Sequence, residues 1–194
     1  MRWLPLILLL LLSACGSTPT HYFVLTPDAT HPAAGAMPGL SLEINMLRLP
    51  KYLDRPQIVS HSSNNELVLA EHAQWGGKLR DNMMRLLARN LGDALGTTQI
   101  AIAPYRPSEP AMVRVMVEVL RFERMADGVV QLDAQWRLID GRSGRTLVAR
   151  ISRLHGAGKV DGWEETTRSM SRVFGRFSRE IAREIRRRFH APSG

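Results

Sequence analysis

Apolar and polar residues alternate over residues 40–47, 113–119 and 130–138, which is the pattern of β-strands with one buried face. Residues 22–25, 57–60, 66–69 and 146–154 predict further, mostly short strands. Turn-forming residues separate the last three predicted strands, 113–119, 130–138 and 146–154, at Asp127-Gly128 and at Asp140–Gly144. Strands joined by such short turns pair with their neighbours in antiparallel fashion. Residues 113–154 therefore predict an antiparallel meander.

Two segments have a helical period instead. From Trp75 to Leu95 apolar residues recur every three or four positions, and Gly96 is a typical helix end. A second apolar stripe of the same period extends from Trp163 to Phe189. Residues 28–39 and 156–162, rich in Gly, Pro and Ala, predict loops. The fold predicted from this order is α+β, with one mixed, largely antiparallel sheet covered by two amphipathic helices.

The N-terminus has the pattern of a secretory signal. Arg2 is followed by an apolar run that ends at Leu12, and Ser13-Ala14 supplies the small residues that a signal peptidase requires. The run is shorter than the roughly 20 apolar residues that a membrane-spanning helix needs. Leu12-Ser13-Ala14-Cys15 resembles the bacterial lipobox, which implies a lipid on the cysteine sulfur. The alternative is an ordinary secreted protein with a lone reactive thiol.

These boundaries predict four segments. Residues 1–14 are a cleaved lipoprotein signal peptide, 15–21 the lipidated cysteine with a short tether, 22–190 a single domain, and 191–194 a tail. About 180 residues remain after cleavage, enough for one domain with its own core. Gly16 occupies the position where aspartate commonly retains lipoproteins at the inner membrane, so we expect attachment at the periplasmic face of the outer membrane.

The net positive charge of the chain bears on which partners it could bind. The net charge is +8, which is typical of proteins that bind polyanions, but an exported protein meets little nucleic acid, and we expect none as a partner. Much of the excess lies near the C-terminus, at Arg168, Arg172, Arg176, Arg179, Arg183, Arg186, Arg187 and Arg188. These arginines are either a solvated helix face near its C-terminal end or a surface for anionic lipid or an acidic partner.

No motif for catalysis is complete. The six histidines show no metal-ligand spacing, and the single cysteine excludes a multi-thiolate site. Gly156–Gly162 has its third glycine one position too late for a dinucleotide loop, and Gly141–Gly144 lacks the spacing of a serine-hydrolase elbow. We therefore expect no catalytic residue, no metal and no cofactor, and predict that the chain is not an enzyme.

The segment from Pro50 to Pro56 is the candidate partner-contact surface. Its two prolines limit its freedom, and the candidate contact residues are Pro50, Tyr52, Leu53 and Arg55. Aromatic anchors of this kind often dominate interfaces. In the alternative, Tyr52 and Leu53 fold back onto the sheet and the segment is structural.

The chain resembles the auxiliary lipoproteins of ABC-type transport systems, the PqiC type. The residues that carry the resemblance are Tyr22–Leu25 soon after the lipobox, the 49–59 segment, Trp75 leading into the first helix, alternate residues of 132–138 including Trp136, and Ser178–Ala182. The 49–59 segment is the most specific of these. Lys78 departs from the family, which often has proline there, and this puts in doubt how that helix begins.

The resemblance implies a docking subunit in lipid trafficking across the cell envelope. Its partners would be a periplasmic MCE-domain protein that forms a hydrophobic tunnel, together with an ABC permease and its ATPase, and its own assembly a homo-oligomeric ring. An alternative function is an envelope-assembly lipoprotein that chaperones or plugs an outer-membrane protein. An enzyme is the third and least supported function.

Overall fold

The computed structural model describes residues 18–27, 35–63, 65–105 and 109–189. Within these residues, eight strands form one sheet and two helices lie against it. The strands are β1 (His21–Phe23), β2 (Leu42–Arg48), β3 (Gln57–Ser63), β4 (Glu66–Trp75), β5 (Ile100–Ile102), β6 (Val113–Arg124), β7 (Val129–Asp140) and β8 (Thr146–Lys159). The helices are α2 (Leu79–Leu95) and α3 (Gly162–Phe189).

The predicted fold class is confirmed, because the sheet is mixed and its longest pairings are antiparallel. β6, β7 and β8 form the predicted meander. On its other side β6 pairs in parallel with β2 over its first half and with β3 near its end, at Arg124. β3 and β4 form an antiparallel hairpin, β1 pairs in parallel with the end of β4, and β5 lies beyond β2.

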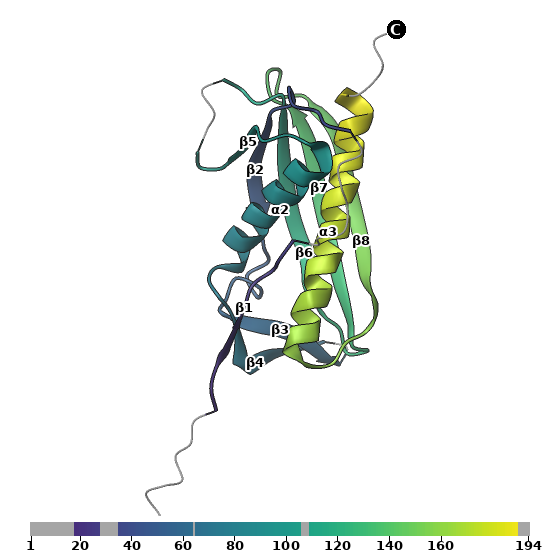
Figure 1. Ribbon diagram of the computed structural model, residues 1–194. Helices are drawn as coiled ribbons and strands as arrows, with labels where there is room; N and C mark the ends of the chain where they lie inside the picture. The colour runs from purple at the N-terminus through teal and green to yellow at the C-terminus, as the bar shows by residue number, and fades with distance from the viewer. Residues whose placement is uncertain (1–17, 28–34, 64, 106–108, 190–194) are drawn as a thin grey trace, which may run out of the picture.

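Both helices cover one face of the sheet and lie side by side (Figure 1). The alternating apolar residues of β6 and β7 point toward them, and Trp136 is the largest fully buried side chain. Phe122, Phe174 and Phe177 form a ring cluster between β6 and α3, with centroids 5.8–6.1 Å apart. Because almost all of the apolar stripe of α3 is buried, this helix is part of the core.

The first helix begins later than its period predicts. Trp75 is the last residue of β4, where its N–H donates to the Pro56 carbonyl at 2.7 Å. Gly77, with φ of 138°, separates the strand from α2. The predicted end is confirmed, because Gly96 adopts the left-handed conformation with φ of 62° and its N–H donates to the Gly92 carbonyl.

Two other sequence predictions need correction. β8 extends to Lys159, so most of the glycine-rich segment predicted as a loop is strand. Lys159 pairs with Val129, and the Val160 N–H donates to the Gly128 carbonyl, so backbone pairing stabilises a stretch that lacks an apolar alternation. The three-residue strand β5 is absent from the predicted elements, because so short a segment shows no period.

Candidate functional site

The predicted contact loop from Pro50 to Pro56 connects β2 to β3 and folds back onto the protein. The Leu53 N–H donates to the Pro50 carbonyl at 3.0 Å, which closes a tight turn. Leu53 is 2% exposed and belongs to the hydrophobic core. Pro50, Tyr52 and Arg55 are half-buried. Leu53 therefore supports the loop from inside, as the structural alternative proposes, and a contact role of the loop stays a prediction.

A buried carboxylate lies beneath this loop. Glu123 of β6 is fully buried, with His61 Nδ1 3.2 Å and Arg121 Nε 3.6 Å from its Oε1. Burial raises the pKa of Glu123, although the Tyr52 hydroxyl, His61 and Arg121 each act to lower it. Burial, followed by the charge of Glu123, raises the pKa of Tyr52 well above its usual range. Tyr52 therefore faces inward, toward this carboxylate.

The position of Glu123 depends on a β-bulge. Between Val119 and Arg121 the pairing of β6 with β7 shifts by one residue, and the shift places Phe122 in the core and Glu123 on the opposite face. The sequence carries a sign of this bulge, because the apolar alternation of β6 breaks after Val119 and resumes at Phe122. No sequence motif marks Glu123 or His61, because the two residues are far apart along the chain.

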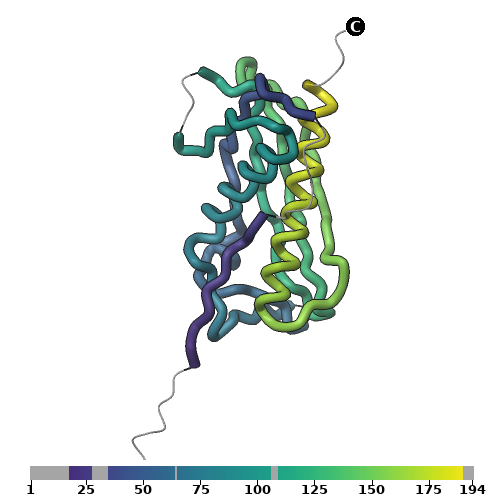
Figure 2. The backbone as a smooth tube through the Cα atoms, in the orientation of Figure 1, coloured from purple at the N-terminus to yellow at the C-terminus, as the bar shows by residue number. Residues whose placement is uncertain are grey.

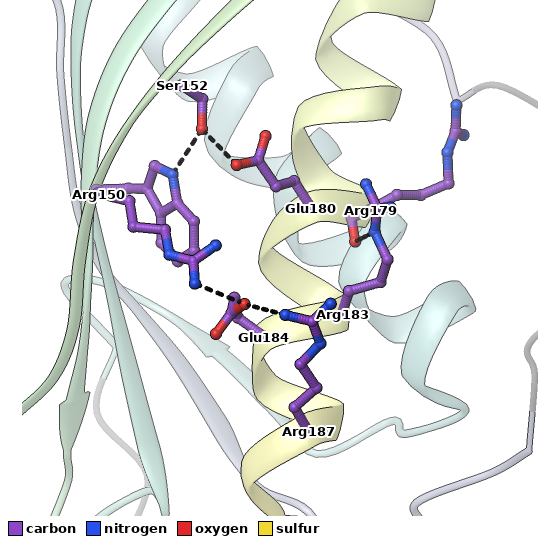
Figure 3. Close-up of polar contacts among 8 residues, drawn as sticks. Arg150, Ser152, Arg179, Glu180, Arg183, Glu184 and Arg187 are labelled. Atoms are coloured by element: carbon purple, nitrogen blue, oxygen red, sulfur yellow. Dashed lines mark hydrogen bonds and ion pairs between the residues drawn. The ribbon is translucent and has the colours of Figure 1, made fainter.

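Hydrogen bonds and ion pairs join α3 to the neighbouring strands. Ser152 of β8 and Glu180 of α3 meet at 2.9 Å, and Trp136 Nε1 donates to the same hydroxyl at 2.9 Å. Glu184, 4% exposed, binds Arg150 and Arg187, each at 3.0 Å (Figure 3). These polar contacts fix α3 against β8.

The remaining arginines of α3 differ in what they bind. Arg186 donates to the carbonyls of Gly35 and Ala94 at 2.9 and 2.7 Å, and Arg176 donates to the His155 carbonyl. Arg168, Arg172, Arg176, Arg183, Arg187 and Arg188 are exposed. The predicted apolar stripe is therefore buried and six of the eight predicted arginines are exposed, whereas Arg179 and Arg186 are half-buried.

Neither a metal site nor a membrane-spanning helix is found in the described part of the chain. Among these residues, no three His, Cys, Asp or Glu side chains gather in a way that could hold a metal ion. Within the same residues, no helix is both long and apolar enough to cross a membrane. Cys15, the predicted lipid attachment site, lies outside the described residues, as do residues 1–14 and the 191–194 tail.

Comparison with known proteins gives one family. Residues 23–182 match the model of the ABC-type transport auxiliary lipoprotein component. The intermembrane transport lipoprotein PqiC of Escherichia coli is 26% identical over 189 residues, which cover 96% of this chain and 98% of PqiC. The PqiC of Shigella flexneri matches equally well.

Two crystal structures share the fold. One, of an uncharacterised protein, has a TM-score of 0.73 at 22% identity and covers 87% of this chain and 99% of its own. The other, of a protein from Xanthomonas campestris, has a TM-score of 0.64 at 15% identity and covers 86% of this chain and 93% of its own. At these identities the likeness concerns the fold.

Proposed function

The chain belongs to the family of ABC-type transport auxiliary lipoproteins, and on that premise we propose that it is the membrane-anchored auxiliary subunit of an intermembrane lipid transport system. The observation that carries the proposal is the extent of the match, which includes α2, most of α3 and nearly the whole sheet. The PqiC relatives, named as intermembrane transport lipoproteins, align over almost their full length.

The anchor in this proposal is Cys15. Two acyl chains make membrane attachment stable, at about 0.8 kcal/mol for each buried methylene. Five residues lie between Cys15 and His21, where β1 begins, so the six residue steps of the tether span at most about 20 Å at 3.3–3.6 Å per residue. The domain would then act close to the periplasmic face of the outer membrane, the location that Gly16 favours.

The partners in the proposal are a periplasmic MCE-domain protein, an ABC permease and its ATPase. The domain would join the outer-membrane end of the periplasmic tunnel, singly or as a homo-oligomeric ring. A docking role requires a rigid body with contact surfaces. The buried core, the polar contacts that fix α3 and the exposed arginines of α3 agree with that requirement.

The anchor is tested with Cys15→Ala. We expect loss of labelled palmitate and release of the domain from the membrane fraction, with the thermal unfolding of the domain unchanged, because the described core begins at Leu25. Ser17→Ala is the matched control and should keep the label. Acyl label or membrane retention that persists in Cys15→Ala would contradict the anchor.

The transport role is tested by crosslinking in intact cells followed by purification of the tagged chain. We expect an MCE-domain protein and ABC subunits among the crosslinked products. Reproducible recovery of an outer-membrane β-barrel in their place would contradict the transport role and favour the envelope-assembly function.

A further inference from the structure

Strand β4 carries three consecutive exposed apolar residues at an open edge of the sheet. Leu67, Val68 and Leu69 are 38–41% exposed. β1 pairs with β4 only at residues 73–75, so among the described strands the first part of β4 has β3 as its one neighbour. Successive strand residues point to opposite faces, and one core cannot bury all three. This edge therefore presents apolar side chains in two directions.

β1 and the residue after it carry two more exposed apolar side chains, near the other end of β4. Tyr22 is 68% exposed and Val24 is 53% exposed, and Tyr22 pairs with Gln74 near the end of β4. Soluble proteins usually protect open edges with charges or proline. Here the charges, Glu66 and Glu71, flank the triplet, and its centre has no such protection. We call Tyr22, Val24, Leu67, Val68 and Leu69 the apolar edge.

A basic pocket of about 310 Å³ lies where β8 ends and α3 begins. Lys159, Arg168 and Arg172 line it, with Glu165 as its one carboxylate. Arg168 is already held by Glu164 at 2.7 Å. Lys159 and Arg172 are exposed and form no ion pair with the described residues. The pocket therefore has two cations available for an external anion.

The apolar edge and the basic pocket are at the same end of the molecule. Trp163, in the first turn of α3, packs against Arg124 with the guanidinium carbon 5.0 Å from the ring centroid. Arg124 pairs with Ser60 of β3, and Ser60 pairs with Val68 of β4. This series of contacts connects the start of α3 to the apolar edge.

The described chain also begins at this end. Figure 2 shows the first segment, in purple, leaving beside β4, while the C-terminal end of α3 lies at the opposite end. At 3.3–3.6 Å per residue, Cys15 is within about 10 Å of Thr18, the first described residue. An acyl group on Cys15 would therefore hold this end of the domain, and not the other, near the bilayer.

We propose that this end of the domain is a membrane-contact surface, on which the apolar edge enters the interface of an anionic phospholipid bilayer while Lys159 and Arg172 bind headgroup phosphates. The inference rests on the membrane attachment in the proposed function and deepens it. On β4, Glu66 and Glu71 limit insertion to the apolar triplet between them. Each cation near an anionic surface changes partitioning about fivefold, so the two cations together contribute more than tenfold.

The test is vesicle flotation of a chain lacking residues 1–15, which keeps the described core, since the buried residues lie between Leu25 and Ile185. The anionic vesicles contain phosphatidylethanolamine with 30% phosphatidylglycerol, and the neutral vesicles contain phosphatidylcholine alone. The two types differ in surface charge, which is the property that the assay compares. We expect binding to the anionic vesicles that weakens with salt, and little binding to the neutral ones.

Two double variants separate the parts of the surface. Lys159→Glu with Arg172→Glu should lower the partition coefficient at least tenfold. Leu67→Ser with Leu69→Ser should lower binding and also remove the part that persists at high salt. The matched charge control is Arg142→Glu with Arg188→Glu, two exposed arginines at the opposite end, and the matched apolar control is Ile151→Ser, at 55% exposure. Both controls should change binding less than threefold.

Thermal unfolding confirms that each variant is folded before its binding is compared. Equal losses in the Lys159/Arg172 pair and the Arg142/Arg188 pair would show general attraction of a basic protein and overturn the proposal. A folded wild-type chain that binds neither vesicle would also overturn it. Because the assayed chain has no Cys15, its result is independent of the Cys15→Ala experiment, and either proposal can fail while the other stands.

Discussion

Replacing Leu53 with alanine tests whether this side chain of the Pro50–Pro56 loop packs in the core or contacts a partner. The side chain is 2% exposed, and truncating a buried leucine to alanine costs about 2–5 kcal/mol of unfolding free energy. For a domain of 150–250 residues each kcal/mol shifts Tm by about 2–4 °C. We therefore expect Leu53→Ala to lower Tm by about 4–20 °C in differential scanning calorimetry.

The control is Lys51→Ala, in the same turn but exposed. It should change stability by less than about 0.5 kcal/mol. Crosslinking to partners is then compared at a temperature where both variants are folded, and Leu53→Ala should retain the wild-type products. Wild-type Tm in Leu53→Ala, combined with lost crosslinking, would refute the placement of this side chain in the core.

Two further predictions concern the core face of α3 and the buried carboxylate. Phe177→Asp should unfold the domain because it places an unpaired charge at a fully buried position, whereas Arg172→Glu should leave the calorimetric transition intact; the reverse order would mean that the core face of α3 is wrongly assigned. Burial raises the pKa of Glu123, so its ionisation costs stability, a cost that is absent below the unfolded pKa of about 4.3 and grows as the pH rises through the raised folded value. The stability of Glu123→Gln relative to wild type should therefore improve between pH 4 and pH 8 in denaturant titrations, and a difference that is independent of pH would show that Glu123 titrates normally.

The elements that the sequence predicts well are those in which one apolar period is unbroken. The meander of β6 to β8 and the stripe of α3 are of this kind, because each element packs one continuous face on the core. The spacing of Trp75 to Leu79 fits a helical turn and predicts that Trp75 belongs to the helix, yet Gly76 and Gly77 separate β4 from α2. β8 extends past Leu154 through backbone pairing, which side-chain patterns do not report.

The candidate surfaces were harder to predict, because each depends on residues that are distant along the chain. The sequence placed Tyr52 and Leu53 in a stiff loop but did not show which way they point. Leu53 packs into the core, and Tyr52 faces Glu123, which a bulge in β6 turns away from the helices. Likewise, Lys159 and Leu67 are about ninety residues apart in the sequence, and the sheet alone brings their elements to one end.

In the proposed function, a lipid anchor on Cys15 places this domain where it can join a transport complex. This placement is tested by comparing the crosslinked partners of the wild-type chain and of Cys15→Ala, purified from the same amount of cells. Anchoring raises the effective concentration of the domain near its partners, so we expect recovery of the MCE-domain protein and ABC subunits with the wild type and at least a tenfold lower recovery with Cys15→Ala. Equal recovery from the two chains, or recovery of no transport subunit with the acylated wild type, would contradict it.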